Sequence, residues 1–367
     1  MAGTELSVPV VFVSSHAKAG GAEGYLATLV ESLGSDWVRC VVCLEDGPLV
    51  ERLRADRVPV EVLPTSRHSW GIVGSARRLR RLLGRVQPAV VHANGIKAAL
   101  VSVLATRRPI VWAKHDFSYD GPLARFVAGR CALVVGVSEA VTRTFPERDR
   151  IEVVHNGLPP GVVDREAGRE RLEQALGAPP GEVVALVGRL DPVKGHRELL
   201  AVASGIRERR RDLRLVFVGG PDASHPGYEE ELRREAGDEA SFLGHRDDAR
   251  ELIAGCDLVA IPTVVPEGFP YVGLEALAAG TPVVGYADGG LPELVGPCGR
   301  LVPPGDRDAL AEAIASLLAD ESLRRELGEC GRERVAGAFG LDRMVEAMRN
   351  AYRRAAATRS RSEPRNS

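Results

Sequence analysis

Two glutamates, Glu267 and Glu275, lie eight positions apart in the sequence PEGFPYVGLEALAAG, which spans residues 266–280. The pattern from Tyr271 to Ala279 predicts a short helix that is apolar on nearly every side and therefore buried, with Glu275 as its only charge. A buried carboxylate is costly unless something hydrogen-bonds to it, and a pair of sugar hydroxyls would be a suitable partner. The alternative is that Glu275 reaches the surface or pairs with an arginine.

The loop before this helix, Glu267-Gly268-Phe269-Pro270, has residues that suit a binding turn. Gly268 allows the backbone to approach a ligand closely. Pro270 suits the first helical position, because a missing N–H costs nothing there.

A second segment, GRLDPVKG at Gly188–Gly195, places Arg189 and Lys194 on either side of a turn, and a helix is predicted to begin near His196. The N–H groups and dipole at a helix start attract anions. An arginine can fork onto phosphate oxygens and a lysine can add a point charge, so the segment suits a diphosphate. The alternative is a surface turn with two solvated cations. It is not a Walker loop, because the G-x-x-x-x-G-K-[ST] pattern is absent.

Three histidines, His16, His92 and His115, are predicted to lie at strand ends in the first half of the chain. Ligands of open parallel sheets bind outside the carboxyl ends of the strands, so these side chains predict a polar cleft floor. Asp116 follows His115 and could orient its imidazole or meet an acceptor. Gly20-Gly21 opens the first predicted helix with a turn of small residues, whose backbone could touch a phosphate.

Strand-like apolar runs alternate with amphipathic helical segments almost throughout, which predicts parallel sheets covered by helices. The fold class is therefore α/β, with the same architecture occurring twice. The expected strands are Val8–Val13, Val38–Leu44, Val60–Leu63, Ala89–His92, Ile110–Ala113, Leu133–Val137, Ile151–Val154, Val183–Val187, Leu213–Val218, Ser241–Leu243, Leu258–Ile261, Pro282–Val284 and Arg300–Val302.

The length of 367 residues fits two domains of about 150 residues or somewhat more. We predict Rossmann-like domains over residues 1–160 and 161–340, with the Pro- and Gly-rich segment Gly157–Glu182 as their connection. A helix over residues 341–357 is expected to cross back to the first domain. Residues 358–367, rich in Arg and Ser, are expected to be disordered.

The combination of these segments resembles the family 4 glycosyltransferases, which are retaining enzymes of the GT-B fold, and the resemblance runs from the first strand to the last helix. The motifs that carry it are GGAE (Gly20–Glu23), VVH (Val90–His92), KHD (Lys114–Asp116), HNG (His155–Gly157), GRLDPVKG (Gly188–Gly195), VGGPD (Val218–Asp222), FLGHRDD (Phe242–Asp248), E-x7-E (Glu267–Glu275) and GGLPELV (Gly289–Val295).

The resemblance implies two doubly wound domains that face a central cleft. The N-terminal domain would bind the acceptor and the C-terminal domain a nucleoside-diphosphate sugar. It implies that Arg189 and Lys194 clamp the donor diphosphate and that Glu275 holds the ribose hydroxyls. A hexosyl group would then pass to an acceptor hydroxyl with retention of configuration, and the departing phosphate would take the acceptor proton.

The resemblance also implies that Glu267, with the backbone of residues 268–270, grips the hydroxyls of the donor sugar. His115 would lie beside the sugar and phosphate, and the backbone of Gly21 would face the donor phosphate. On the acceptor side we expect His16, His92 and Asp116. One departure is Thr263, where the family usually has serine.

Two other classes of function stay open. A sugar-nucleotide epimerase on the same fold would keep the diphosphate site, and an inactive nucleotide-sugar-binding protein should have lost Lys194 or Glu267, which are both present. A dinucleotide dehydrogenase is disfavoured, because no G-x-G-x-x-G follows a strand.

No cofactor or metal is expected beyond the nucleotide sugar as co-substrate. The D-x-D at Asp306–Asp308 opens a helical pattern, which predicts that Asp306 caps a helix. The net charge of −2 gives no argument for nucleic acid, and nothing in the sequence defines an oligomeric state.

The six cysteines are scattered, and the C-x-x-C of Cys40 and Cys43 lies in a strand-like run, which disfavours zinc or redox chemistry. Reduced thiols in a cytoplasm fit best. The N-terminal segment has no signal-peptide pattern, and no apolar run is long enough to span a bilayer.

The segment Ser75–Val86 forms a basic amphipathic helical pattern. We favour a core-facing apolar stripe with solvated arginines, and weak peripheral contact with a membrane is the alternative.

Overall fold

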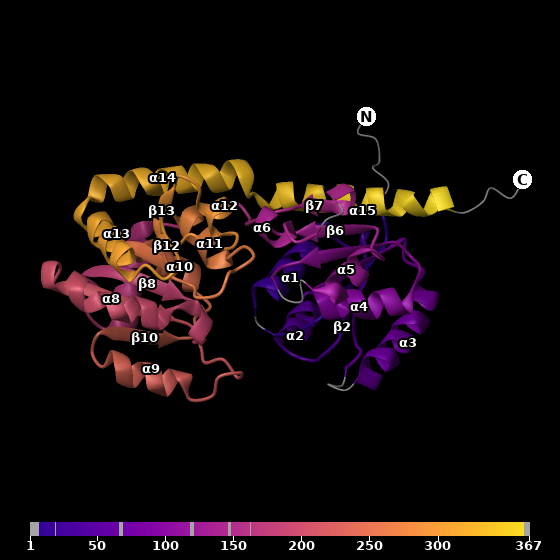
Figure 1. Cartoon of the computed structure of the whole chain (residues 1–367), viewed down its shortest axis with the longest axis horizontal. Coiled ribbons are helices and arrows are strands. Elements are labelled where there is room, and N and C mark those ends of the chain that lie inside the picture. Colours follow the sequence, from indigo (N-terminus) through magenta and orange to yellow (C-terminus); the bar gives the residue numbers. More distant parts are fainter. Residues whose placement is uncertain are drawn as a thin grey trace, which may run out of the picture. The chain divides into compact units, whose positions relative to one another are not determined.

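Parallel strands that alternate with helices build most of the described chain, as the sequence pattern predicts (Figure 1). The computed structural model describes residues 7–18, 20–65, 69–117, 121–145, 148–161 and 163–362. The chain divides into two units: unit 1 comprises Met1–Asn156 with Asp342–Ser367, and unit 2 comprises Gly157–Leu341. The predicted boundary after residue 160 lies a few residues beyond this division.

Unit 1 is built on a sheet of seven parallel strands within the described residues, in the order β3-β2-β1-β4-β5-β6-β7. The strands are β1 (Val10–Ser14), β2 (Val38–Cys43), β3 (Val60–Val62), β4 (Val90–Asn94), β5 (Ile110–Lys114), β6 (Leu133–Gly136) and β7 (Ile151–Val153). The helices are α1 (Gly21–Leu33), α2 (Pro48–Ala55), α3 (Ser69–Val86), α4 (Ile96–Ala105), α5 (Pro122–Ala128), α6 (Glu139–Thr142), the 3-10 turn η1 (Arg148–Arg150) and α15 (Leu341–Ser362).

Unit 2 repeats this architecture with a sheet of six parallel strands in its described part, in the order β10-β9-β8-β11-β12-β13. The strands are β8 (Glu182–Val187), β9 (Leu213–Val218), β10 (Ala240–Gly244), β11 (Leu258–Ile261), β12 (Val283–Tyr286) and β13 (Gly299–Val302). The helices are α7 (Arg165–Leu176), η2 (Pro192–Lys194), α8 (His196–Arg209), α9 (Tyr228–Ala236), α10 (Ala249–Gly255), α11 (Tyr271–Ala279), α12 (Leu291–Val295), α13 (Arg307–Ala319) and α14 (Glu321–Ala338).

The central strands are buried along their whole length because both faces of each sheet are covered. Every residue of β1, β4 and β5 is buried, and so is every residue of β11 and β12. In each sheet the strand order reverses at one place, between β1 and β4 in unit 1 and between β8 and β11 in unit 2. In doubly wound folds this reversal opens a crevice at the carboxyl ends of the strands, where ligands bind.

The last helix, α15, belongs to unit 1, to which it returns after the end of unit 2 (yellow in Figure 1). Tyr352 is fully buried, and its hydroxyl lies 2.9 Å from Nδ1 of His92 on β4. The guanidinium groups of Arg349 and Arg353 lie over the ring of Trp37. The helix continues to Ser362, so the disorder expected from residue 358 is wrong for its first part, and residues 363–367 lie outside the described residues.

The segment Gly157–Glu182 is more than a connection, because most of it packs as part of unit 2. Helix α7 lies against α10, and a side chain at Gly168 would collide with the backbone of α10. Leu172 is fully buried, and Arg165 and Arg169 both donate to Asp257. The charged helical segment that we expected in the connection is therefore α7, which packs against α10 and exposes its charged side.

Cys298 and Cys330 form a disulfide, so the expectation of reduced thiols is wrong for this pair. The fold brings their Cα atoms to 5.3 Å, a separation that a disulfide can bridge, although they are 32 positions apart in the sequence. Cys40 and Cys43 are free and buried on β2, as the strand-like run predicts. Burial raises the pKa of Cys40 to about 11 and that of Cys43 to about 12.

The basic amphipathic segment Ser75–Val86 forms the greater part of α3, and its apolar face points into unit 1. Ala76, Leu79 and Leu83 are buried in the core, whereas the arginines at positions 77, 78, 81 and 85 are exposed. The core-facing interpretation is therefore confirmed for the apolar stripe. None of the helices in the described ranges is both long enough and apolar enough to cross a bilayer.

Candidate active site

Two loops meet where the strand order of unit 2 reverses. Residues 188–195 follow β8 and residues 262–270 follow β11. The N–H of Val264 donates to the carbonyl of Val193 over 3.0 Å. The loop of residues 188–195 and the loop of residues 262–270 are thus joined by a backbone hydrogen bond.

Gly195 is required for this close approach of the two loops. Its φ is +80°, a left-handed conformation that favours glycine, and a Cβ there would lie 1.9 Å from the carbonyl oxygen of Pro262. The final glycine of GRLDPVKG therefore lets the loop that carries Lys194 pack directly against the loop that carries Glu267.

Lys194 and Glu267 form an ion pair at this edge, with 2.7 Å between Nζ and Oε2. Their side chains are 21% and 25% exposed. The second carboxylate oxygen, Oε1, is buried and has no hydrogen-bond partner among the described residues. A buried oxygen without a partner is costly, so Glu267 retains an acceptor that a ligand hydroxyl would satisfy.

The backbone of Glu267 is held by the GGLPELV segment. The N–H of Gly290 donates to the Glu267 carbonyl over 2.8 Å. Gly289 has φ +58°, and a Cβ there would lie 2.2 Å from the same carbonyl oxygen. The two glycines before α12 thus hold the backbone of Glu267 in place.

Arg189 belongs to the same edge and lies between two buried carboxylates. Its guanidinium forms ion pairs with Asp191, at 3.8 Å, and with Asp222, in the loop after β9. The Arg189 side chain is half exposed, whereas those of Asp191 and Asp222 are 9% and 4% exposed. One side of the guanidinium therefore faces the protein, and the rest is accessible to a ligand.

Glu275 lies on α11 and is half-buried. It has no hydrogen-bond or ion-pair partner among the residues that the structure describes, so the alternative of a pair with an arginine is wrong. Burial raises the pKa of Glu275 to about 7, against a smaller opposing effect of Arg250. A carboxylate kept unpaired at this cost is typical of a binding or catalytic group.

The turn between the two glutamates offers backbone rather than side chains. Phe269 is buried, with its ring 5.3 Å from that of Phe339. Pro270 is the N-cap of α11, whose first residue is Tyr271, so the predicted position of Pro270 inside the helix is wrong by one residue. Gly268 is buried between Glu267 and Phe269.

In unit 1, His115 follows β5 and is oriented by Asn94, the last residue of β4. Asn94 donates through Nδ2 to the carbonyl of Ala22, over 3.0 Å, which turns its Oδ1 toward His115. The distance from His115 Nε2 to this oxygen is 2.6 Å, so Nε2 carries the proton and Nδ1 is left as an acceptor. Burial lowers the pKa of His115 to about 4, which makes the ring neutral near pH 7.

The other sequence-predicted residues of unit 1 lie near the same sheet edge, with one exception. Gly21 is the first residue of α1, directly after the N-cap Gly20. His16 is exposed and lies 3.1 Å from Glu45, and Asp116 is exposed next to His115.

His92 is the exception, and its expected place on a polar cleft floor is wrong. It lies in the middle of β4 rather than at the end of the strand, is fully buried, and contacts Tyr352 of α15. Burial lowers the pKa of His92 to about 3. The strand continues to Asn94, so Asn94 occupies the edge position that was expected for His92.

Three polar residues at these edges were not predicted from the sequence: Asn94, Asp191 and Asp222. Asn94 could have been found as the polar residue that ends an apolar strand run. Asp191 and Asp222 lie in quoted motifs that follow strands, but their pairing with Arg189 depends on how the two loops pack.

The D-x-D motif serves a helix, as predicted. Asp306 is the N-cap of α13 and accepts from the Ala309 N–H over 2.9 Å. Within the described ranges, no group of three or more His, Cys, Asp or Glu side chains is arranged to hold a metal ion.

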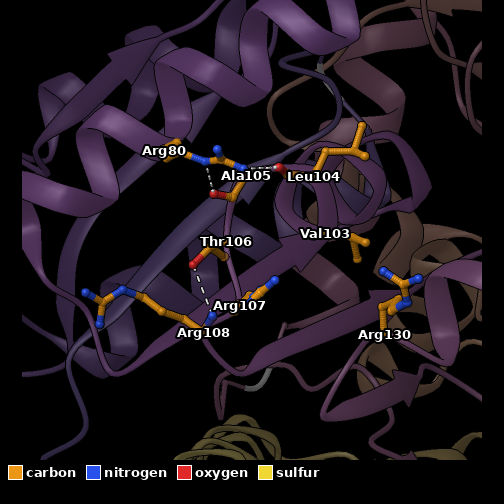
Figure 2. Close-up of a pocket in the computed structure, with 8 residues that line it drawn as sticks. All are labelled: Arg80, Val103, Leu104, Ala105, Thr106, Arg107, Arg108 and Arg130. Atoms are coloured by element: carbon orange, nitrogen blue, oxygen red, sulfur yellow. Dashed lines mark hydrogen bonds between the residues drawn. The ribbon is translucent and has the colours of Figure 1, made fainter.

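A pocket of about 720 Å³ in unit 1 lies at the opposite edge, before β5 begins (Figure 2). Arg80 donates there to the carbonyls of Ala105 and Leu104, each over 3.0 Å, and so caps the end of α4. The side chains that line the pocket are Arg80, Val103, Leu104, Ala105, Thr106, Arg107, Arg108 and Arg130. This pocket is distinct from the strand ends that carry the candidate site residues.

Comparisons with known proteins agree with this arrangement. Residues 19–161 match the family model described as Glycosyltransferase Family 4, and residues 168–334 match the model described as Glycosyl transferases group 1. The D-inositol 3-phosphate glycosyltransferase of Salinispora arenicola is 35% identical over 238 residues, which cover 60% of this chain and 53% of that protein. The phosphatidyl-myo-inositol mannosyltransferase of Mycobacterium leprae is 38% identical over 163 residues, 42% of either chain. The chain spans about half the length of the curated relatives it matches.

Solved structures show the same fold over nearly the whole chain. Anabaena HepE, in complex with UDP and glucose, has a TM-score of 0.83 at 25% identity, covering 96% of this chain and 100% of HepE. Sucrose-phosphate synthase from Thermosynechococcus elongatus has a TM-score of 0.80 at 23% identity, with coverage of 96% and 100%. The fold is therefore GT-B, as expected, and with family models matching both halves of it, this chain belongs to glycosyltransferase family 4.

Proposed function

We propose that this chain is a retaining hexosyltransferase that moves a hexosyl group from a nucleoside-diphosphate sugar to a hydroxyl group of an acceptor. The family membership supports the reaction class. The observation that carries the proposal is the Lys194–Glu267 pair at the reversal of strand order, with one carboxylate oxygen left without a partner. A cation next to an unsatisfied carboxylate fits a ligand that brings both phosphate and hydroxyl groups.

In this proposal, Arg189 and Lys194 bind the diphosphate of the donor. Negative charge develops on the leaving phosphate while the sugar carbon becomes positive, and preorganised cations stabilise that separation of charge. Glu267 and the backbone of residues 268–270 bind the sugar hydroxyls, and Glu275 binds the ribose.

The departing phosphate takes the proton of the acceptor hydroxyl on the face from which the acceptor attacks. His115 is neutral in this scheme and acts as a hydrogen-bonding group beside the donor, with Nδ1 as its acceptor atom. No metal ion is needed, because two protein cations neutralise the diphosphate.

Uridine diphosphate sugars are the first donors to test, because HepE was solved with UDP and with UDP-glucose. Inositol phosphates are the first acceptors, since curated relatives carry the name D-inositol 3-phosphate glycosyltransferase. Natural products, oligosaccharides and lipid-linked glycans complete the acceptor set.

A thermal-shift screen of nucleotide sugars tests the donor. A donor present at about 100 times its dissociation constant adds about 2.7 kcal/mol to the unfolding free energy, and Lys194→Ala should abolish that shift. The absence of a shift with every nucleotide sugar would contradict the proposal. If a donor without acceptor is converted to its epimer, the chain is a sugar-nucleotide epimerase instead.

The proposal includes a cytoplasmic location and weak peripheral contact with an anionic membrane. The disulfide removes the argument from reduced thiols, so the location does not rest on the cysteines. Since the apolar stripe of α3 packs into unit 1, such contact would be electrostatic, through the exposed arginines of that helix. Sedimentation with anionic vesicles that salt does not reverse, or no sedimentation at low salt, would contradict it.

A further inference from the structure

We infer that Asp222 is a positioning residue of the donor site, which holds the Arg189 guanidinium in place for the diphosphate. The inference rests on the proposed function, because it assumes that Arg189 meets a phosphate. The Asp222 side chain is 4% exposed. It lies in the loop after β9, outside the segment that carries Arg189 and Lys194.

Backbone contacts hold the loop of Asp222 against that of Arg189. The N–H of Leu190 donates to the carbonyl of Gly220 over 2.8 Å, and Leu190 forms an isolated parallel bridge with Pro221. These contacts directly precede Asp222 and directly follow Arg189. The side chains of Arg189 and Asp222 therefore meet where the backbones of their two loops are paired.

Each of the two carboxylates around Arg189 is fixed by its own loop. Asp222 Oδ1 accepts from the N–H of Ser224 over 2.7 Å, and Asp191 Oδ1 accepts from the N–H of Val193 over 3.0 Å. The Oδ2 atoms of both residues face the Arg189 guanidinium. Asp222 makes the closer contact and is the more deeply buried of the two.

The Arg189 guanidinium is held by the two carboxylates, and its solvent-exposed side stays available to a ligand. Arginine has five N–H donors in a rigid fork, so two carboxylates behind it do not exhaust its donors. A half-exposed arginine without such support would lose its rotamer freedom when the donor binds. Fixing it beforehand lowers that cost, whereas a carboxylate close to a diphosphate also repels it. The burial of Asp222 behind the guanidinium favours positioning over repulsion.

The test is a double-mutant cycle on the full chain, read by calorimetric titration. The probe is whichever of UDP, GDP, ADP and dTDP binds the unmodified chain most tightly. Asp222→Asn keeps Oδ1 for Ser224 and removes only the charge. It should weaken binding of the diphosphate by up to roughly 30-fold, the factor that corresponds to the rotamer freedom of an arginine. Binding of the matching nucleoside, which has no phosphate, should stay unchanged.

The cycle separates positioning from a structural role. In an Arg189→Ala background, Asp222→Asn should have no further effect, because the group through which Asp222 acts is gone. An equal loss in both backgrounds, or weaker binding of the nucleoside, would show that Asp222 merely supports the fold. Unchanged binding in Asp222→Asn would show that Asp222 does not position the guanidinium, and tighter binding would show that it competes with the donor for Arg189. Each of these results overturns the inference.

Two further variants keep the result interpretable. Asp191→Asn should also weaken diphosphate binding, but less, because the contact of Asp191 with Arg189 is longer. This variant replaces Asp222→Asn in the cycle if Asp222→Asn does not fold. Asp247→Asn removes an exposed carboxylate from the next loop and should bind the diphosphate as the unmodified chain does. If none of the four diphosphates binds the unmodified chain, the proposed function fails, and the inference fails with it.

Discussion

Lys194 Nζ lies 2.7 Å from Glu267 Oε2, so the lysine proposed to bind phosphate is already paired with the glutamate proposed to bind sugar. Arg189 is likewise paired, with Asp222 and Asp191. Both candidate phosphate-binding cations are therefore held by carboxylates of the protein. A donor would enter a site whose charges are preset, which is the arrangement that electrostatic stabilisation of a leaving group requires.

The first prediction concerns these cations. Lys194→Ala and Arg189→Ala should each lower turnover by roughly 10²-fold or more, because each removes a preorganised charge from the leaving group. Steady-state assays with the identified donor check this. Arg209→Ala removes an exposed arginine from a surface ion pair with Glu312 and serves as a control with normal turnover. Near-normal turnover in either site variant would remove that residue from the diphosphate clamp.

The second prediction separates the two glutamates. Glu275→Gln should weaken binding of the nucleotide sugar and of the free nucleoside diphosphate alike, each by roughly 1.5–3 kcal/mol, because both ligands contain the ribose. Glu267→Gln should lower turnover and leave the nucleoside diphosphate bound about as tightly as before, since the diphosphate lacks the sugar. Calorimetry with both ligands measures this. Equal weakening of the nucleoside diphosphate in the two variants would mean that the carboxylates form a single nucleotide site.

The third prediction uses the raised pKa of Glu275. Its pKa is about 7 in the folded chain and that of an unfolded glutamate is ~4.3, so the folded state binds this proton more tightly. The tighter proton binding by Glu275 stabilises the folded state. This stabilisation is fully present below the pKa of the unfolded glutamate and is lost as the pH rises through about 7.

Glu275→Gln cannot ionise and avoids that loss. Between about pH 5 and pH 8 its unfolding free energy should rise relative to the unmodified chain by on the order of 2 kcal/mol. Urea unfolding at both pH values, without ligand, gives the difference. Glu312→Gln, at an exposed position, should show none. A difference for Glu275→Gln that does not change with pH would contradict the raised pKa.

The fourth prediction concerns the tautomer of His115. Asn94→Ala removes the acceptor for Nε2–H and should lower turnover by about 10- to 100-fold, the factor that corresponds to a buried donor left unsatisfied. Because the pKa of His115 is about 4, we also expect no step in the pH–rate profile from this histidine between about pH 6 and pH 8. Steady-state rates across that range test both points. A protonation step that disappears in His115→Gln would show that His115 titrates there.

The fold was predictable because both sheets are parallel and buried. Apolar runs such as Leu258–Ile261 can be read directly as strands, and a strand's end locates the sheet edge where ligands bind. This reading places Lys194 and Glu267 correctly, because each lies in the loop that follows a central strand.

Side-chain partnerships across the fold were not predictable in the same way. His92 and Asn94 are two residues apart in one apolar run, and only the register of β4 shows which one reaches the edge. The Cys298–Cys330 disulfide depends on packing between distant segments, and so does the contact between Arg189 and Asp222. Local patterns carry no information about these pairings.

The most direct test of the account is the anomeric configuration of the product. The chain is incubated with an α-linked nucleotide sugar and its acceptor in excess chelator, and the anomeric proton of the product is followed by NMR. We predict an α-linked product, formed at an undiminished rate without free metal, and roughly 10²-fold slower formation with Lys194→Ala. A β-linked product, or a reaction that stops in chelator and resumes with manganese or magnesium, would contradict the account.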